Sequence, residues 1–585
     1  MNAYEFDVMN IIAEQGYTNQ RSIAEIAKYS LGRVNSAVKG LIDKEYLDQD
    51  FQLTAKALEE MALKKPKNAI ILAAGYGMRM FPINRETPKG LLKIHEEQLV
   101  ERVIRQLHDV GIFDITVVVG FMKECYEYLI DTYGVQLVYN KDFGSKNNIH
   151  SLNLVLDKLS NSYIIPCDIW CRDNPFSRSE LYSWYMVKDA TDEHSMIRMN
   201  RKKELVLAHD DQGIQMVGIS YLVEEEARKV RERIRIMARD KVFDSNFWEE
   251  ALIEEGKFIT LARTVSTNDV FEINTFEELR ELDEESENLN SEIIQLSAEI
   301  LHVAEKEIKN IEVLKKGMTN RSFSFRCKDK RYIMRIPGEG TGEMINRTQE
   351  ALVYDAVKGK VKTDPVVYIN PQNGYKMAEY LENIRECDPK DQEDVRQAMK
   401  MLRSFHELKL SVPHEFDLFE RINYYESLWK ENPSIFIDYP ETKSKIWALK
   451  TMVEGMDRAY VLTHIDAVPD NFLFVDNEIR LIDWEYAGMQ DPHVDIAMFA
   501  IYSLYQREEI DELIDAYFVE GCTVENRMKI YAYIAICGLL WSNWCEYKRM
   551  CGVEFGEYSL RQYRYAKEYY NIIKNEFTRK TEENG

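Results

Sequence analysis

The sequence predicts a multidomain protein with a helical N-terminus, a central α/β domain on a mostly parallel sheet, and a C-terminal α+β domain. Three changes of pattern support this prediction. Apolar residues recur at helical spacing up to residue 65, strand-like and helix-like runs alternate from 66 to 288, and strands followed by long aromatic-rich helical segments fill 289–585. The acidic stretch ELDEESENLNSE, residues 281–292, is the expected linker between the last two domains.

Residues 1–65 contain three helix-like segments, then the short strand pair around YLDQDFQLT, then a further helical run. This order predicts a winged helix-turn-helix, in which RVNSAVKGLIDK would be the recognition helix. Arg33 and Lys39 are the cations of that helix before Lys44, and the segment as a whole is nearly balanced in charge. A regulatory or dimerising role is therefore favoured over DNA binding, while DNA binding and a homodimer both stay open.

Composition excludes several classes of protein. A net charge of -24 argues against a general nucleic-acid binder, although small anionic ligands need only a few local cations. The sequence has no apolar run of about 20 residues and no basic-then-apolar leader. The nine cysteines are scattered without a CxxC pair, which is typical of reduced thiols. We therefore expect a cytoplasmic protein.

The stretch ILAAGYGMRMFPINRETPKGLLKI, residues 71–94, is the strongest local signal in the central domain. It follows a strand-like run, and its glycines allow the backbone to wrap closely around a ligand. Arg79 and Lys89 bring two cations to the same region, which suits a triphosphate. No Gly-Lys-Ser/Thr follows, so this is not a P-loop, and a GxGxxG motif would need a third glycine.

This stretch resembles the signature of sugar-nucleotide and alcohol-phosphate nucleotidyltransferases, LxAGxGxRxxPxTxxxPKxLxxI. The matching residues are Leu72, Ala74, Gly75, Gly77, Arg79, Pro82, Pro88, Lys89, Leu91 and Ile94. The resemblance implies a Rossmann-like fold, with Asp168 as a metal ligand and the FEINT segment as a second acidic cluster. Asn274 stands there in place of an aspartate and would bind Mg²⁺ more weakly, with help from Glu272.

The segment NKDFGSKNNIHSL, residues 140–152, looks like that of cytidylyltransferases that load choline phosphate. Asn147 and Asn148 could read a base or a ribose there, or lie in a plain polar loop. Trp170 and Tyr221 are candidates to face a quaternary ammonium, which is held by aromatic rings. Core packing is an equally good interpretation of each one.

Two motifs in the C-terminal domain, LTHIDAVPDNFLF and LIDWEYAG, fit phosphoryl transfer. This chemistry needs a carboxylate to orient the attacking hydroxyl, here Asp466, and metal ligands, here Asn471 and Asp483. Upstream, the hairpin KKGMTNRSFSF would cover the phosphates. Thr319 and Asn320 of this hairpin are candidate nucleotide-binding residues. Arg335 is a candidate catalytic residue, and Glu350 is its expected ion-pair partner at the nucleotide site.

These motifs resemble choline/ethanolamine kinases over nearly all of residues 291–585. The resemblance implies a protein-kinase-like fold, Asp466 as catalytic base, and arginine at the 335 position, where protein kinases keep lysine. Trp541 and Trp544, three residues apart, share a helix face and would box the trimethylammonium, although a core stripe is the commoner meaning of such spacing. Weaker candidates for the choline site are Glu485 and Tyr486, and we expect His464 and Asp495 to brace the loop.

Together the motifs predict three domains, residues 1–65, 66–288 and 289–585, and a bifunctional enzyme that makes CDP-choline. Choline kinase and phosphocholine cytidylyltransferase catalyse consecutive steps, with ATP and CTP as co-substrates and Mg²⁺ at both sites. This combination resembles the bacterial phosphorylcholine-incorporation type. One alternative keeps the chemistry but uses ethanolamine or another amino alcohol. A second is a winged-helix regulator that senses metabolites through degenerate enzyme domains.

Overall fold

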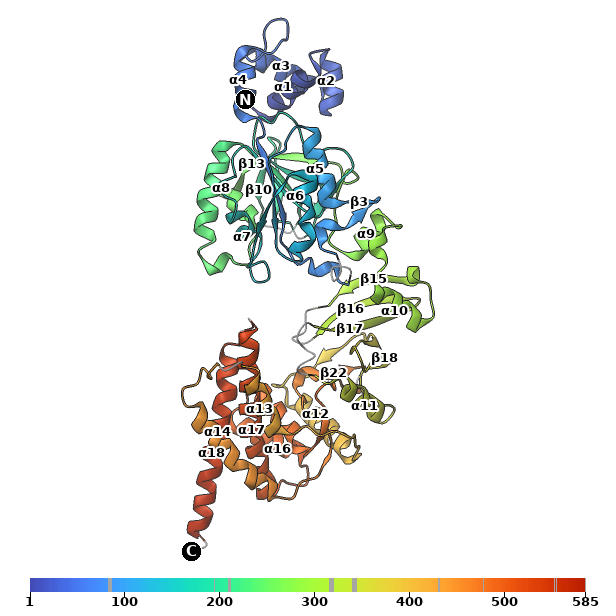
Figure 1. Ribbon diagram of the computed structural model, residues 1–585, viewed down its shortest axis with the longest axis vertical. Coiled ribbons are helices and arrows are strands. Elements are labelled where there is room, and N and C mark those ends of the chain that lie inside the picture. Colours follow the sequence, from blue (N-terminus) through green and yellow to red (C-terminus); the bar gives the residue numbers. More distant parts are fainter. Residues whose placement is uncertain are drawn as a thin grey trace. The chain divides into compact units, whose positions relative to one another are not determined.

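The computed structural model forms two compact units, residues 1–313 and 314–585, and each is described by itself (Figure 1). The residues described are 1–82, 87–193, 195–208, 212–314, 320–338, 345–429, 432–476, 478–551, 553 and 555–583. The expected division into three domains stays a prediction. Within the described residues, no helix is both long enough and apolar enough to span a bilayer.

Unit 1 begins with helices α1 (Ala3–Gln15), α2 (Gln20–Ala27) and α3 (Leu31–Asp43), followed by α4 (Ala55–Lys64). An Asn, Ser or Thr side chain accepts a hydrogen bond in the first turn of each helix, as N-cap residues do. A single β-bridge joins the segment between α3 and α4 to itself, where the sequence predicts a small hairpin. The helix order agrees with the predicted winged helix, whose assignment stays a prediction.

Helix α1 packs directly against the sheet domain of unit 1. Phe6 stacks on Tyr182 with ring centroids 5.2 Å apart. Asp7 accepts a hydrogen bond from the Tyr182 hydroxyl at 2.9 Å, pairs with Lys203 at 2.9 Å, and also accepts from the Tyr29 hydroxyl. One hydrophobic core runs continuously from these helices into the sheet. The N-terminal helices are therefore part of the folded body of unit 1.

The sheet of unit 1 has the order β5-β4-β1-β6-β11-β8-β13-β10-β9, and β12 pairs with β13. Its strands are β1 (Asn68–Ala73), β4 (Ile115–Val119), β5 (Gln136–Tyr139), β6 (Ser162–Pro166), β8 (Trp184–Asp192), β9 (Ile197–Met199), β10 (Glu204–Leu207), β11 (Gly213–Leu222), β12 (Ile253–Glu254) and β13 (Lys257–Val265).

The strands β5, β4, β1 and β6 are parallel, whereas most of the remaining pairs are antiparallel. The sheet is therefore mixed, and the prediction of a mostly parallel sheet holds for β5, β4, β1 and β6 and for the β8–β13 pair. The described residues between β8 and β11 include no helix, so these two strands lack the helical crossover of a parallel pair and pair antiparallel.

Helices cover both faces of the sheet, as the alternation of strands and helices predicts (Figure 1). They are α5 (Leu99–Asp109) and α6 (Tyr128–Tyr133) on one face, with α7 (Asn148–Asn153) and α8 (Glu224–Met237) on the other. Successive residues of β1 serve opposite faces, since Ile71 joins the core under α5 and Ile70 joins the core under α7 and α8. Burial on both faces explains why this strand is apolar from Ala69 to Ala73.

Unit 2 begins with the antiparallel strands β16, β17, β19 and β18, paired in that order. Helix α11 lies in the segment between β17 and β19. The bounds are β16 (Asn320–Cys327), β17 (Lys330–Pro337), α11 (Arg347–Val357), β18 (Val366–Ile369) and β19 (Lys376–Glu379).

The rest of unit 2 is mostly helical, with short strand pairs that carry the predicted motifs. The strands are β20 (Arg385–Glu386), β21 (Val461–Thr463), β22 (Phe472–Val475), β23 (Glu478–Leu481) and β24 (Gly488–Gln490). The helices are α12 (Gln392–Glu407), α13 (Leu418–Ser427), α14 (Tyr439–Glu454), α15 (His493–Tyr502), α16 (Arg507–Tyr517), α17 (Val524–Met550) and α18 (Glu557–Glu583). Figure 1 shows α17 beside α18, and α17 is buried along most of its length.

We expect Asp7→Ala to destabilise unit 1, because it leaves the Lys203 ammonium and the Tyr182 hydroxyl without their shared acceptor. The expected loss is about 1–3 kcal/mol, measured as a lower midpoint of thermal unfolding. Asp43→Ala removes an exposed carboxylate from α3 and should change stability by less than about 0.5 kcal/mol. Equal effects of the two substitutions would contradict the docking role of Asp7.

Candidate active sites

A cavity of about 630 Å³ opens beside the carboxyl ends of β1 and β6 in unit 1. Ligands in open α/β sheets bind outside these strand ends, where loops converge. The lining comes from segments far apart in the sequence, namely residues 72–77, 143–148, 166–168, 216–218, 244–245 and 247–249, together with Arg79, Lys89, Tyr126, Ser151, Tyr185, Glu272 and Asn274.

The glycine-containing loop after β1 forms one wall of this cavity. The predicted nucleotide-binding residues Leu72, Ala74, Gly75 and Gly77 all line it. Gly77 has φ +59°, in the left-handed region that disfavours a side chain. The loop therefore presents its backbone to the cavity, as the sequence predicts.

Two cations and two oxygen-bearing side chains meet in the cavity, namely Arg79, Lys89, Asp168 and Asn274. Lys89 forms an ion pair with Oδ2 of Asp168 and donates to Oδ1 of Asn274 at 2.8 Å. Arg79 also donates to Oδ1 of Asn274, at 3.3 Å. The Asn274 amide oxygen is thus shared by two cations, which explains how a neutral side chain replaces an aspartate at this position.

Asp168 and Glu272 provide the oxygen donors that a divalent cation needs. Oδ1 of Asp168 is buried and has no hydrogen-bond partner among the described residues. Burial, with a contribution from the Asp168 charge, raises the pKa of Glu272. Two carboxylates that repel one another, one with an unpartnered oxygen, fit Mg²⁺ by their chemistry. The sequence also predicts Asn274 as a ligand, and its amide oxygen accepts from Lys89 and Arg79, so metal binding by Asp168, Glu272 and Asn274 stays a prediction.

Asn147 and Asn148 hold the segment 244–249 against the cavity. The Asn147 backbone N–H donates to the Asp244 carbonyl at 2.7 Å, and its side-chain amide donates to the Ser245 carbonyl at 2.9 Å. Oδ1 of Asn148 accepts from the Trp248 N–H at 2.7 Å. Both asparagines line the cavity, and the structure uses their amides to position a loop. Their predicted contact with the nucleotide stays a prediction.

Tyr185, Trp248 and Glu249 also line the cavity, and sequence reasoning missed all three. The Tyr185 hydroxyl donates to Oε1 of Glu249 at 3.0 Å, whereas Oε2 is buried without a partner among the described residues. Burial raises the pKa of Glu249 to about 7. No motif marks this group, because its members come from a strand and from a distant loop.

Trp170 and Tyr221 lie elsewhere in unit 1, outside the set of residues that lines the cavity. The Arg102 guanidinium lies over the Trp170 ring at 4.9 Å, and Phe271 packs nearby. The Tyr221 hydroxyl donates to the carbonyl of Lys64, the last residue of α4. The core-packing interpretation of these two residues therefore agrees with their contacts, and the ammonium-facing interpretation does not.

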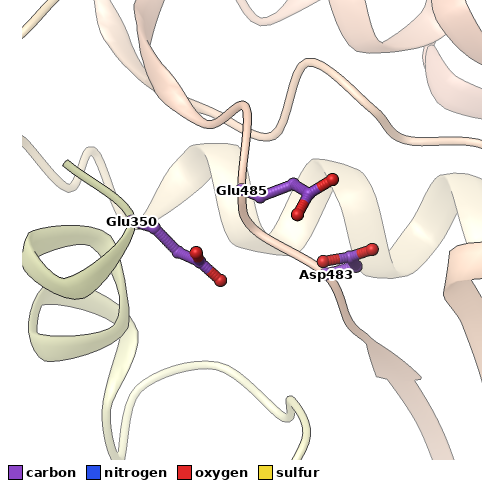
Figure 2. Close-up of side chains that lie close together, drawn as sticks. All are labelled: Glu350, Asp483 and Glu485. Atoms are coloured by element: carbon purple, nitrogen blue, oxygen red, sulfur yellow. The ribbon is translucent and has the colours of Figure 1, made fainter. Parts of the chain in front are cut away.

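In unit 2, Arg335 joins three buried or half-buried carboxylates. It forms an ion pair with Glu350 of α11, contacts Asp483 at 3.1 Å and Glu485 at 3.4 Å. Figure 2 shows these three carboxylates converging from α11 and from the segment after β23. Arg347 adds a second guanidinium, 2.9 Å from Glu350 and 3.3 Å from Glu485. The predicted partnership of Arg335 and Glu350 is present.

The two arginines decide which carboxylate is available to a cation. Burial raises the pKa of Glu350, but Arg335, Lys376 and Arg347 outweigh it and leave this pKa below its ordinary value. Three carboxylate oxygens within 4.8 Å could bind a metal by distance alone. Each glutamate pairs with both guanidiniums and is buried, whereas Asp483 pairs with Arg335 and is half-buried, so Asp483 is the ligand that fits Mg²⁺ best.

Asp466 and Asn471 lie beside Asp483 in the loop between β21 and β22. The Asn471 amide donates to the Asp466 carbonyl at 2.8 Å and to its carboxylate at 3.2 Å. The Ile482 N–H donates to the Asn471 carbonyl at 3.0 Å, which joins the two motifs. Burial, with the charges of Asp483 and Glu485, raises the pKa of Asp466 to about 8. The site thus holds excess negative charge that favours bound cations.

Backbone geometry and a buried aspartate fix this loop. Ile465 and Asp483 have φ of +70° and +66°, a strained conformation for residues with side chains and one that is frequent at functional sites. Asp495 accepts hydrogen bonds from the backbone N–H groups of His464 and Ile465 at 2.9 and 2.7 Å. Nε2 of His464 contacts the Ile482 carbonyl at 2.9 Å, and burial lowers the pKa of His464 to about 4. Both residues brace the loop.

An aromatic cluster lies next to these acids. Trp541 contacts Tyr486 and Trp544 edge-on, with centroids 5.8 and 5.5 Å apart, and Trp544 contacts Phe555 at 5.2 Å. Tyr486 directly follows Glu485 in the chain, so this end of the cluster lies beside the acids. The predicted residue Trp541 is therefore in contact with both Tyr486 and Trp544.

The two predicted phosphate-hairpin residues have different outcomes. Thr319 lies outside the described residues. The Asn320 amide donates to Glu485 at 3.0 Å, and its oxygen accepts from Arg347 at 3.1 Å. Asn320 is therefore part of the ion-pair network around Glu485.

Comparisons with known proteins match two different families, one to the part of the chain that holds each site. Residues 69–233 match the family model of the MobA-like NTP transferase domain, and residues 311–536 match that of choline/ethanolamine kinase. Choline-phosphate cytidylyltransferase of Streptococcus pneumoniae is 32% identical over 228 residues, which cover 38% of this chain and 99% of that protein.

Two further relatives match one part of the chain each. Protein LicA of Haemophilus influenzae is 28% identical over 260 residues, which cover 42% of this chain and 76% of that protein. The 2-aminoethylphosphonate cytidylyltransferase of Lancefieldella rimae is 29% identical over 234 residues, which cover 37% of this chain and 92% of that protein. The chain therefore belongs to the choline-phosphate cytidylyltransferase family through its central domain, and it carries a choline/ethanolamine kinase domain after it.

Proposed function

We propose that the chain is a bifunctional enzyme that makes CDP-choline. Unit 2 phosphorylates choline with ATP, and unit 1 transfers the cytidylyl group of CTP to phosphocholine and releases pyrophosphate. The observation that carries this proposal is the presence of two separately assembled sites whose relatives catalyse consecutive steps. The product of unit 2 is the substrate of unit 1.

In the kinase step, the choline hydroxyl oxygen attacks the γ-phosphorus of ATP, the bond to the β,γ-bridging oxygen breaks, and ADP leaves. Asp466 orients the hydroxyl and accepts its proton. Asn471 and Asp483 would hold Mg²⁺, which when bound neutralises phosphate charge. Arg335, which forms an ion pair with Glu350, would bind the nucleotide phosphates.

In the transferase step, a phosphate oxygen of phosphocholine attacks the α-phosphorus of CTP, and the bond to the α,β-bridging oxygen breaks. Arg79 and Lys89 offset the charge that develops on the leaving pyrophosphate. Asp168, with Glu272, would hold Mg²⁺ beside them. No protein nucleophile is needed, because the phosphate of the substrate is itself the nucleophile.

Aromatic rings beside carboxylates support a quaternary ammonium substrate in both units. In unit 1 these groups are Tyr185, Trp248 and Glu249, and in unit 2 they are Tyr486, Trp541 and Trp544 with the acids near them. A trimethylammonium group has no N–H to donate, so aromatic faces and carboxylate charge are what can hold it.

A second candidate substrate is a primary amine such as ethanolamine or an aminophosphonate. The unpartnered Oε2 of Glu249 could accept an N–H from such a group. The Lancefieldella rimae relative, named for 2-aminoethylphosphonate, supports the same possibility. The aromatic cluster of unit 2 favours choline as the first substrate.

We also propose a cytoplasmic location, since all nine cysteines are free thiols. DNA binding by residues 1–65 and a homodimer stay predictions. The presence of Asp168, Asp466, Asn471 and Asp483 in assembled sites argues against degenerate enzyme domains.

The two-site proposal predicts separable losses of activity. With choline, ATP, CTP and Mg²⁺, Asp466→Ala should lower phosphocholine formation by roughly 100-fold or more, because it removes the proton acceptor. CDP-choline synthesis from added phosphocholine should continue in that variant. Lys89→Ala should show the converse, with products measured by mass spectrometry. Loss of both activities in either folded variant would refute two independent sites.

The choline assignment predicts a selective effect of the aromatic cluster. Trp541→Leu removes a ring that would face the trimethylammonium, so KM for choline should rise by roughly tenfold, or about 1.4 kcal/mol. KM for ethanolamine should change less, because its ammonium relies on hydrogen bonds. Steady-state kinetics of the kinase step with both substrates provides the comparison, and wild-type preference for ethanolamine would replace choline as the substrate.

The raised pKa of Glu249 predicts a pH dependence of the transferase. The carboxyl is mostly protonated below about pH 7 and ionised above it, and only the ionised form attracts an ammonium. KM for phosphocholine should therefore rise as pH falls from 8 to 6. Glu249→Gln should raise KM at pH 8 and remove much of this dependence. An identical pH profile in the variant would show that the phosphate group of the substrate alone causes it.

A further inference from the structure

Unit 2 contains a cavity of about 550 Å³ that neither proposed reaction uses. It lies at the C-terminal end of α11 and is bounded by residues 358–364, β18 and Arg480 of β23. None of the proposed choline, nucleotide or metal-binding residues lines it.

Positive charge gathers around this cavity, in a chain whose net charge is -24. Lys358, Lys360, Lys362 and Arg480 line it. The Arg480 guanidinium donates to the Thr363 carbonyl at 2.9 Å, while its Nε–H is buried without a partner among the described residues. A buried N–H donor without an acceptor is costly, and an anion can satisfy it.

The acids near the cavity are largely neutralised by other groups. Asp364 forms a 3.0 Å ion pair with Lys376, and although burial raises its pKa, Lys376 lowers it below the ordinary value. Glu478 pairs with Lys362. Asp355 is the remaining carboxylate of the lining. Lys358, Lys360 and Arg480 thus leave a net positive charge on the wall.

Two hydrogen-bonded connections join this wall to the kinase site. The Trp484 indole donates to Oγ1 of Thr363 at 2.8 Å, and Trp484 lies between Asp483 and Glu485 in sequence. On the other side, the hydroxyl of Tyr354 on α11 contacts Asp364 at 3.0 Å and accepts from Lys376.

These connections reach the central ion pair of the site. Tyr354 follows Glu350 by one turn of α11, so both residues move with that helix. Lys376 is the strand partner of Arg335, because β19 pairs with β17 in that register. Glu350 is therefore one helical turn from Tyr354, which lines the cavity. Arg335 is paired in the sheet with Lys376, which forms an ion pair with Asp364 of the lining.

We propose that this cavity binds a small anion with phosphate groups, and that binding raises kinase activity. The anion offsets repulsion among the cations and holds the end of α11 and Thr363 in the arrangement that supports Glu350 and Asp483. Coupling of this kind requires that the ligand binds that arrangement better than others. The site goes beyond the proposed function, because binding here does not depend on which alcohol is phosphorylated.

Inorganic pyrophosphate is a suitable probe, with hydrogen–deuterium exchange of the full chain as a local readout. We expect slower exchange in residues 354–369 and 478–483 when pyrophosphate is added. Lys358→Gln/Lys360→Gln changes exposed side chains that should not affect folding, and Arg480→Gln removes the buried donor. Each variant should need a roughly tenfold higher pyrophosphate concentration to reach half of the full protection. The matched control, Lys390→Gln/Lys400→Gln, changes two other exposed lysines of unit 2 and should behave as wild type.

The activity readout uses choline phosphorylation at subsaturating ATP. Pyrophosphate should raise the rate of the wild type and of the control, and leave the cavity variants unchanged. If pyrophosphate protected only the active-site segments from exchange, or protected all variants equally, the proposal of an anion site in this cavity would be wrong. Inhibition of equal size in all variants would overturn the coupling. The exchange measurement involves no turnover, so its failure would leave the proposed function standing.

Discussion

Both sites depend on one constraint, which is that several carboxylates are buried close together and need cations to compensate their charge. In unit 2, Glu350, Asp483 and Glu485 approach within 4.8 Å, and such a cluster is unstable unless cations compensate it. Arg335 and Arg347 supply that compensation and also attach α11 to the segment after β23. The same contacts therefore attach these segments to one another, and Asp483, which pairs with Arg335 and is the most exposed of the three carboxylates, can still reach a bound cation.

Unit 1 meets the same constraint with different residues. Lys89 pairs with Asp168, and Asn274 lies where a third carboxylate would add to the repulsion. A neutral amide here accepts hydrogen bonds from two cations and adds no charge. The departure from the acidic family pattern is therefore compatible with an assembled site.

Loops that carry functional groups are held by residues that do no chemistry themselves. Asp495 binds two backbone N–H groups of the Asp466 loop, and Asn148 binds the Trp248 N–H in the loop that carries Glu249. The N-terminal helices and the sheet share a core in a similar way, with Phe6 and Asp7 of α1 in contact with Tyr182. A substitution at Asp495, Asp7 or Phe6 would alter a site through geometry, since none of these side chains is among the predicted substrate contacts.

The sequence by itself determined the order of elements, the two phosphate-binding motifs, and the charged residues Arg79, Lys89, Asp168, Asp466 and Asp483. These are readable because glycine loops and acids at strand ends have local causes that a short window contains. It did not determine the mixed sheet, the Tyr185–Glu249 contact, the burial of Trp170 and Tyr221, or the cationic cavity behind α11. Each of those depends on segments that are distant in the chain, and only tertiary packing decides which distant side chains meet and which lose contact with water.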